Sequence, residues 1–135
     1  MDTLTPAQRS EHMRRIRSRD TRPEVSLRRL VWSLGYRYRK NRRGLIGSPD
    51  LAFVGRKRAI FLHGCFWHRH RCSAGVRVPK SRVDYWKAKF TRNVHRDAVV
   101  MRQLKSVGWR ALVIWECQLA DTSRVARRIR KFLDA

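Results

Sequence analysis

Apolar and polar positions along the first third of the chain predict two basic helices followed by a short strand. Residues 5–17 begin at a Thr-Pro pair suited to a helix start and carry few apolar positions, so this helix is expected to dock weakly on a core. A second helix begins at a capping box formed by Thr21 and Glu24 and ends at Gly35. Residues 36–40 then predict a strand.

Two short apolar runs after a basic loop predict an antiparallel hairpin. The runs cover residues 51–54 and 58–62, and the Gly-Arg-Lys sequence between them is typical of a turn. Pairing across this turn joins residues whose numbers sum to roughly 111 or 112, which places Asp50 opposite Phe61 or Leu62. The start of the first strand and the end of the second are therefore expected to meet in space.

The C-terminal half alternates helices with one further strand. Apolar spacing predicts a short helix over residues 82–90, a longer one over 93–107 and a last one over 121–133. Residues 109–115 are nearly all apolar, which indicates a strand buried on both faces of a sheet. The order α-β-β-β-α-β, with extra helices at both ends, predicts an α/β fold in which a single domain, residues 1–135, surrounds one mixed sheet.

The charge of the chain points to a polyanionic partner. Its 135 residues include 33 Lys and Arg against 10 Asp and Glu, a formal net charge of +23. Self-repulsion on this scale disfavours a compact chain unless an anion offsets it, and an Arg-rich surface suits phosphate groups. Nucleic acid is the leading candidate, and an anionic membrane surface is the alternative. No apolar run predicts a membrane span or a secretory signal, so we expect a reducing, cytoplasmic compartment.

Residues 63–72 hold three of the five histidines and two of the three cysteines. In a reducing compartment, such clusters more often bind metal than form disulfides. A closed tetrahedral zinc site needs four ligands of this kind. The candidates are Cys65, His70, Cys72 and Cys117. By spacing alone, His68 could replace His70. The competing interpretation is three free cysteines beside core histidines.

Asp50 is the only acidic residue between Val25 and Val83, a span with fifteen Lys and Arg. A carboxylate in such a field stays ionised and would repel a phosphate backbone, so it suits a Mg²⁺ ligand. A metal there would stabilise the charge that develops in phosphodiester cleavage. His63 or His68 could accept a proton from the attacking water. An Asx turn or a salt bridge is the purely structural alternative for the carboxylate.

Motifs along nearly the whole chain resemble those of the very-short-patch repair (Vsr) DNA mismatch endonucleases. The block His63-Gly64-Cys65-Phe66-Trp67-His68 and the closing Trp115-Glu116-Cys117 are the most specific of them. The other matching segments are Met13 to Thr21 with Glu24, Pro49-Asp50, His70 and Cys72, Trp86, Asn93 with Arg96-Asp97, and Gly108-Trp109-Arg110.

This resemblance implies a restriction-endonuclease-like fold and a DNA repair activity. Members of the family act at T:G mismatches left by deamination of 5-methylcytosine, and they nick the strand 5′ to the thymine. Asp50 would hold Mg²⁺, together with the backbone carbonyl of Leu62. His68 would be the general base, assisted by His63 and by Glu24. For Glu24, helix capping is the alternative role.

The resemblance also implies structural and DNA-contacting residues. Insertion between base pairs beside the mismatch, where stacking is least costly to disrupt, would fall to Phe66, Trp67 and Trp86. As alternatives, Trp86 could belong to the core, and the other two aromatic side chains could pack under the zinc loop. The structural zinc ligands would be Cys65, His70, Cys72 and Cys117. The first helix, within residues 1–19, would clamp the DNA through Arg14, Arg15, Arg17 and Arg19.

The implied partner is duplex DNA with a T:G mismatch, and mismatch-repair proteins such as MutL are further candidates. The resemblance implies no membrane partner, a monomer, and a bacterial cytoplasmic location at the nucleoid. Two other functions share parts of the pattern. One is a homing or restriction-type nuclease that cuts undamaged DNA, and the other is a non-catalytic zinc-containing module that binds distorted DNA. A pure binding module would have no use for Asp50.

Two positions depart from the family pattern. Leu62 stands where we expect Thr in relatives, so a metal contact there would use the backbone carbonyl. Nucleases of this fold also often carry a second acidic residue and a lysine on the strand that here contains Ile60, Phe61 and Leu62, and neither is present. The expected metal site is therefore poor in carboxylates and relies on water and phosphate oxygens.

Overall fold

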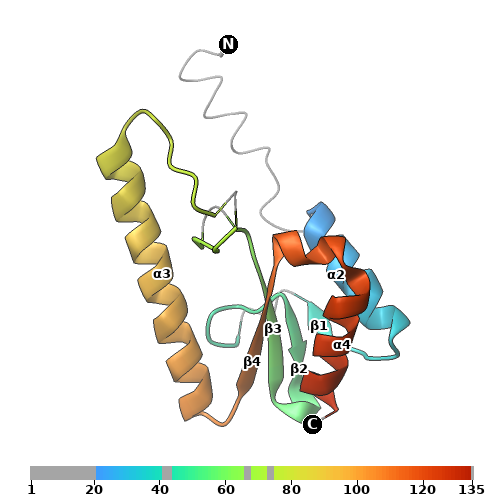
Figure 1. Cartoon of the computed structure of the whole chain (residues 1–135). Helices are drawn as coiled ribbons and strands as arrows, with labels where there is room; N and C mark the ends of the chain where they lie inside the picture. Colours follow the sequence, from blue (N-terminus) through green and yellow to red (C-terminus); the bar gives the residue numbers. More distant parts are fainter. Residues whose placement is uncertain (1–20, 41–43, 66–67, 73–74, 135) are drawn as a thin grey trace, which may run out of the picture.

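The computed structural model describes residues 21–40, 44–65, 68–72 and 75–134 (Figure 1). The helices and strands in chain order are α2 (Arg22–Ser33), β1 (Arg39–Lys40), β2 (Leu51–Phe53), β3 (Arg58–His63), α3 (Val83–Ser106), β4 (Arg110–Trp115) and α4 (Thr122–Leu133). Two 3₁₀ turns, η1 (Val54–Arg56) and η2 (Glu116–Ala120), follow β2 and β4. The predicted helix over residues 5–17 lies outside the described residues.

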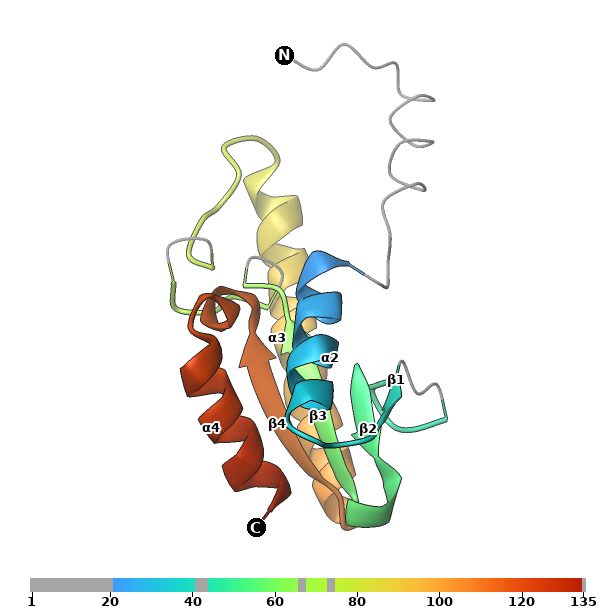
Figure 2. The ribbon, with the colours of Figure 1, turned by 90° about the vertical axis from the view of Figure 1, so that its right-hand side faces the viewer.

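A four-stranded sheet with the order β1-β2-β3-β4 forms the middle layer of the molecule. β2 runs antiparallel to both of its neighbours, β1 and β3, while β3 and β4 run parallel. Helices α2 and α4 cover one face of this sheet, and α3 lies along the other (Figures 1 and 2). This is the mixed α/β sheet that the order of elements predicted.

The larger core lies between the sheet and the helix pair α2 and α4. Leu27 and Val31 of α2 and Ile129 of α4 pack with Ile60 and Ile114 of the sheet, and each is at most 1% exposed. Burying a side chain of this size contributes about 1.5–3 kcal/mol. The core under α3 has fewer fully buried side chains, so this face of the sheet has room for a pocket.

Helix α2 begins and ends as the sequence predicted. The Oγ1 atom of Thr21 accepts a hydrogen bond of 3.5 Å from the backbone N–H of Glu24. Gly35 follows the helix with a φ of +96°, a conformation in which side chains are strained and glycine is not.

The hairpin of β2 and β3 has one of the two predicted registers. Leu51 pairs with Ile60, and Phe53 pairs with Arg58. Asp50, directly before β2, therefore lies at the C-terminal end of β3. Because β4 runs parallel to β3, its own C-terminal end, where Trp115 pairs with His63, lies at the same edge of the sheet.

Three details of the predicted elements were wrong. The predicted helices over residues 82–90 and 93–107 are one continuous helix, α3, because the residues between them include no Gly or Pro that would end it. β1 has two residues instead of five. β4 lies at the edge of the sheet, so only Ile114 of its six residues is fully buried. Despite the length of α3, no helix among the described residues is apolar enough to cross a membrane.

Candidate active site and metal centre

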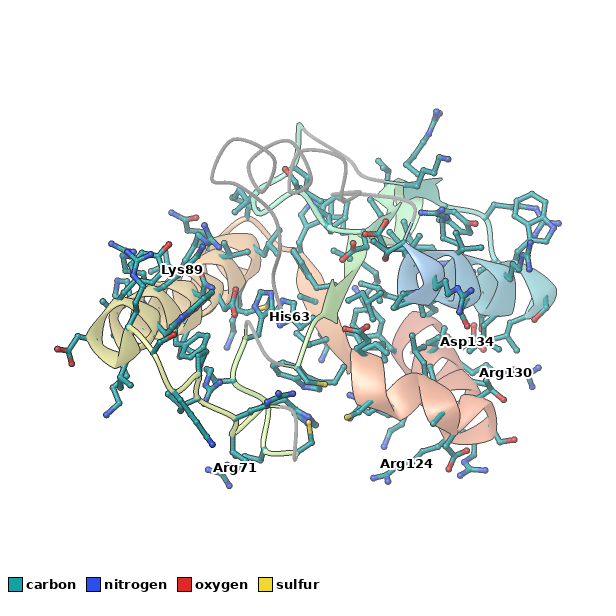
Figure 3. The ribbon with its side chains drawn as sticks, turned by 90° about the horizontal axis from the view of Figure 1, so that it is seen from above. His63, Arg71, Lys89, Arg124, Arg130 and Asp134 are labelled. Atoms are coloured by element: carbon teal, nitrogen blue, oxygen red, sulfur yellow. The ribbon has the colours of Figure 1, made fainter. Side chains whose placement is uncertain are left out.

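A pocket of about 360 Å³ opens between the C-terminal end of β3 and the middle of α3. In Figure 3, the labelled His63 lies near the centre of the molecule, between α3 and the ends of the strands. The residues that line the pocket include Asp50, Leu62, His63, His68, Arg96 and Asp97. The structure thus brings the residues predicted for phosphodiester chemistry to one pocket, apart from Glu24, which does not line it.

Asp50 is fixed in this pocket by the hairpin. Its Oδ2 atom accepts a hydrogen bond of 2.6 Å from the backbone N–H of Leu62 across the two strands. The pKa of Asp50 is raised to about 6, because burial and the nearby charge of Glu24 raise it more than the hydrogen bond from Leu62 lowers it. A bound cation would favour the ionised form, so the environment of this carboxylate suits a metal ligand.

Glu24 lies close enough to Asp50 for its negative charge to raise the pKa of that carboxyl group. The capping bond to Thr21 uses the backbone N–H of Glu24, and its carboxylate lies 3.6 Å from Nη1 of Arg28. Helix capping and a role beside Asp50 are therefore compatible, because they use different parts of the residue.

His68 and Asp97 form a short polar contact in the pocket. Nδ1 of His68 lies 2.6 Å from Oδ2 of Asp97 on α3, and both side chains are 22% exposed. A carboxylate at Nδ1 holds the imidazole in one orientation and leaves Nε2 as the nitrogen that can accept a proton. This pair has the geometry of a general base and the residue that orients it.

His63 stacks on this base. The two imidazole centroids are 3.9 Å apart, and the ring planes are 8° from parallel. The pKa of His63 is lowered to about 4, mainly by burial and also by the adjacent His68, so the ring is neutral near pH 7. Its buried Nδ1 has no hydrogen-bond partner among the described residues. A neutral, packed ring suits support of His68 better than proton transfer at this pH.

Asp97 was not among the residues predicted to take part in the reaction, although the sequence contains a signal for it. Between Tyr85 and Trp115, Asp97 is the only acidic residue. The same isolation in a basic span had marked Asp50. Applied to the second half of the chain, this criterion selects the partner of His68.

A second cluster joins the loop after β3 to the turn after β4. One ligand atom from each of four residues lies within 4.8 Å of the other three, and these residues are Cys65, His70, Cys72 and Cys117. His68, the alternative ligand by spacing, belongs to the pocket instead, in a group with His63 and Asp97. The fourth residue of this candidate metal centre, Cys117, comes from a position far along the chain.

The spacing within this cluster fits a tetrahedral zinc ion. Zn–S and Zn–N bonds of about 2.3 and 2.0 Å at a tetrahedral angle place sulfur and nitrogen about 3.5 Å apart. Sγ of Cys117 lies 3.4 Å from Nδ1 of His70. Burial raises the pKa of the Cys65 thiol to about 11, so a bound cation would be needed to hold it as a thiolate. Three sulfurs and one imidazole leave no position for a substrate, which is typical of a structural site.

Close approach of two loop segments shapes the metal cluster. A Cβ atom on Gly75 would lie 1.7 Å from the backbone oxygen of His70, so no other residue fits there without a backbone shift. Arg69 adopts a left-handed conformation, and its Nη1 donates to the backbone oxygen of Arg77 at 2.7 Å. Its guanidinium also lies 4.1 Å from the ring centroid of Phe90, which ties the loop to α3.

Aromatic side chains gather on the N-terminal half of α3. Trp86 stacks on Phe90 with centroids 6.0 Å apart and meets Tyr85 edge-on at 5.4 Å. Trp86 is half-buried and lies outside both buried core clusters. Lys89 of the same helix half and Arg71 of the loop after β3 are both labelled on this side of the molecule in Figure 3. The other predicted DNA contacts lie outside the described residues, and these are Phe66, Trp67, Arg14, Arg15, Arg17 and Arg19.

Comparisons with known proteins find relatives over nearly the whole chain. A model of the family described as DNA mismatch endonuclease Vsr matches residues 1–74. The type II nicking enzyme V.XorIIP of Xanthomonas oryzae pv. oryzae is 44% identical over 133 residues, which cover 98% of this chain and 97% of the relative. The DNA mismatch endonuclease Vsr of Escherichia coli K12 is 40% identical over 124 residues, which cover 92% of this chain and 79% of the relative.

A solved structure has a similar fold. The catalytic domain of the homing endonuclease I-Bth0305I matches with a TM-score of 0.57 and 22% identity, over 84% of this chain and 94% of that domain. At this identity the similarity concerns the fold alone. The predicted α/β nuclease fold is thereby confirmed.

Proposed function

Because this chain belongs to the Vsr family of DNA mismatch endonucleases, we propose that it nicks one strand of duplex DNA at T:G mismatches. The cut falls 5′ to the mismatched thymine, and the reaction is Mg²⁺-dependent hydrolysis of a phosphodiester bond. The thymine arises by deamination of 5-methylcytosine, so the nick begins its repair. The chain is in any case a DNA endonuclease, as its relatives are.

One observation carries this proposal: a proton acceptor and a metal-type carboxylate line the same pocket. The His68–Asp97 pair stands on the side of α3, and Asp50 stands on the side of the sheet. Hydrolysis of a phosphodiester needs both a base for the attacking water and a positive charge at the phosphate. A module that only binds DNA would gain nothing from this combination.

In the proposed reaction, His68 acts as the general base. The oxygen of a water molecule forms a bond to phosphorus while one of its protons passes to Nε2 of His68. The bond from phosphorus to the 3′ oxygen breaks, and that oxygen leaves with the electron pair and takes a proton from solvent water. Asp97 holds the imidazole in place and stabilises the positive charge that forms on it.

Asp50 is the proposed Mg²⁺ ligand, with the backbone carbonyl of Leu62 as a second one. Mg²⁺ usually binds one or two carboxylates and completes its shell with water and substrate phosphate oxygens. The donors at this end of the hairpin fit that description. The charge of Glu24 raises the pKa of Asp50, and Glu24 is the proposed partner of a metal-bound water. When bound, Mg²⁺ would neutralise negative charge on the scissile phosphate.

Zinc is proposed as the structural ion of the second cluster, held by Cys65, His70, Cys72 and Cys117. DNA contacts follow the same proposal. Phe66, Trp67 and Trp86 would enter the base stack beside the mismatch, where opening is least costly. The basic segment 1–19 would hold the duplex through Arg14, Arg15, Arg17 and Arg19. The chain would act as a monomer at the bacterial nucleoid, where mismatch-repair proteins such as MutL are candidate partners.

A nicking assay on matched duplexes tests the proposal. Two duplexes differ only at one base pair, T:G or C:G, and each strand is end-labelled in turn. With Mg²⁺, we expect a single cut 5′ to the mismatched thymine and an intact guanine strand. With EDTA, or with the variant Asp50→Ala, no cut is expected.

Each result has a clear interpretation. Equal cutting of both duplexes contradicts the mismatch specificity and favours a nuclease for undamaged DNA. Nicking by Asp50→Ala at the wild-type rate contradicts the metal role of that residue. Metal analysis that finds no zinc in the purified protein contradicts the assignment of Cys65, His70, Cys72 and Cys117 as zinc ligands.

A further inference from the structure

Arg96 lies on the α3 side of the pocket, directly before Asp97 in sequence. Its side chain is exposed to solvent, and its Nη2 donates a hydrogen bond of 3.1 Å to Oδ1 of Asn93, one turn earlier in the helix. Among the described residues it has no ion-pair partner. A guanidinium that lines a pocket without a paired carboxylate is available to an anionic ligand.

Arg96 is the only Lys or Arg among the described residues that line this pocket. The wall formed by β3 contributes Phe61, Leu62 and His63, none of which carries a permanent positive charge. The carboxylate of Asp97 is hydrogen-bonded to His68 and forms no ion pair with Arg96. Permanent positive charge therefore reaches this part of the pocket from the helix.

Phosphodiester hydrolysis requires such a charge. Negative charge is spread over the non-bridging oxygens of the phosphoryl group in the transition state, and catalysis consists largely of stabilising it. A guanidinium suits this task because it stays protonated and presents two N–H groups in a planar fork. The hydrogen bond to Asn93 uses one Nη atom and limits the rotation of the fork.

Resting on the proposed function, we infer that Arg96 is a further catalytic residue of this site. Its guanidinium donates hydrogen bonds to the non-bridging oxygens of the scissile phosphate, on the side facing α3. It keeps its protons throughout, and it acts by stabilising charge while the water attacks and the 3′ oxygen leaves. The Mg²⁺ proposed at Asp50 would stabilise negative charge on the same phosphate from the side of the sheet.

The competing explanation is that Arg96 adds only to the general attraction of a basic surface for DNA. The chain has 33 Lys and Arg, so this contribution must be separated from a contact at the reacting group. Arg102 provides the matched control. It lies on the same helix and is exposed, but it does not line the pocket.

The experiment compares Arg96→Gln, Arg96→Lys and Arg102→Gln with the wild-type protein on the T:G duplex. Single-turnover nicking with enzyme in excess gives the rate of the bound complex, and fluorescence anisotropy without Mg²⁺ gives the dissociation constant. Thermal unfolding checks that each variant is folded, which is expected because both side chains are exposed.

Arg96→Gln should slow the bound complex by about 10²–10³-fold, as expected for removal of one transition-state donor. Arg96→Lys should recover part of this loss, since it restores the charge without the planar fork. The dissociation constants of Arg96→Gln and Arg102→Gln should agree within about threefold, because each removes one charge that attracts phosphate. Arg102→Gln should nick at the wild-type rate once bound.

Two failures are distinguishable. If the wild-type protein nicks the T:G duplex and Arg96→Gln nicks it as fast once bound, the role of Arg96 is overturned and the proposed function stands. If the wild-type protein leaves that duplex intact, the proposed function fails and this inference fails with it.

Discussion

The indole of Trp115 stacks on the imidazole of His70, with ring centroids 4.4 Å apart and planes 19° from parallel. The same indole meets His63 nearly edge-on at 5.2 Å. His70 belongs to the sulfur-rich cluster and His63 to the pocket, so one half-buried ring at the end of β4 contacts both sites. Displacement of this ring would disturb the histidine pair, and it would remove a stacking contact from His70 without removing a metal ligand.

Replacing Trp115 separates this contact from metal binding. In Trp115→Ala, His63 and His68 lose a wall of their site, and a misplacement of about 1 Å can slow a reaction by about 10²-fold. We expect a loss of that order in single-turnover nicking of a T:G duplex, with one zinc still bound per chain. Trp115→Phe keeps an aromatic ring and should lose far less. Loss of zinc from Trp115→Ala would instead show that the substitution slows nicking by disturbing the zinc ligands.

Asp50→Asn should make the metal-free fold more stable above pH 6. The pKa of Asp50 is raised by burial from 3.8 to about 6, so the folded state binds more protons than the unfolded state across this interval. The free energy of unfolding therefore falls as pH rises from about 4 to 6. Above pH 6 the full cost of burying the ionised carboxylate applies. An Asn carries no charge and keeps an oxygen for the N–H of Leu62, which should stabilise the fold by about 2–3 kcal/mol.

Urea unfolding of both proteins without Mg²⁺ at pH 4, 6 and 8 checks this expectation. The difference in free energy of unfolding should shrink toward zero at the lowest of these pH values. Nicking should be abolished in Asp50→Asn at every pH. A variant that is less stable than the wild type at pH 8 would show that the carboxylate is stabilised by its surroundings.

Asp97→Asn should slow nicking by about 10²–10⁴-fold with little change in DNA affinity. The amide can turn its NH₂ group toward Nδ1 of His68, which would favour the tautomer with a proton already on Nε2. His68 would then be unable to accept a proton from water at that nitrogen. Single-turnover kinetics on the T:G duplex measure the effect. Nicking by Asp97→Asn at the wild-type rate would show that the His68–Asp97 pair takes no part in the reaction.

Gly75→Ala should weaken the metal cluster. The added Cβ would meet the backbone of His70 at 1.7 Å, so one of the two loop segments must move. Overpacking of this kind costs about 1–3 kcal/mol, and here it also displaces a ligand. Zinc content and melting temperature should both fall. Gly55→Ala is the matched control, because its Cβ would meet nothing within 4 Å; equal results for the two variants would contradict the packing argument.

Much of the site followed from sequence patterns that act over short range. The isolation of Asp50 in a basic span marked it as a candidate, and the pairing rule of the hairpin placed it opposite Phe61 or Leu62. In the structure its carboxylate accepts a hydrogen bond from the N–H of Leu62. The clustering of Cys and His over residues 63–72 indicated the metal-type cluster. Spacing did not choose between His68 and His70, because that choice depends on which ring faces α3 and which faces β4.

The remaining features depend on contacts between distant segments. Asp97 meets His68 only after α3 crosses the sheet, and helical periodicity alone says nothing of such a pairing. The prediction of two helices was wrong because apolar spacing indicates the buried face of a helix better than it indicates the ends. Residues Thr91 to Asn93 include no Gly or Pro that would end a helix. The edge position of β4 follows from sheet order, which its apolar sequence does not encode.

Because α3 is one continuous helix, it fixes the distance and the relative orientation of the residues along it. Trp86 and Asp97 are eleven residues apart on one unbroken helix, which is about three turns and a rise of about 16 Å, so both lie on the same face. With the proposed wedge at one end and the partner of the base at the other, the distance from the disturbed base stack to the cut bond is set by helical rise. An insertion of one residue between them would rotate Trp86 by about 100° relative to Asp97 and uncouple recognition from cleavage.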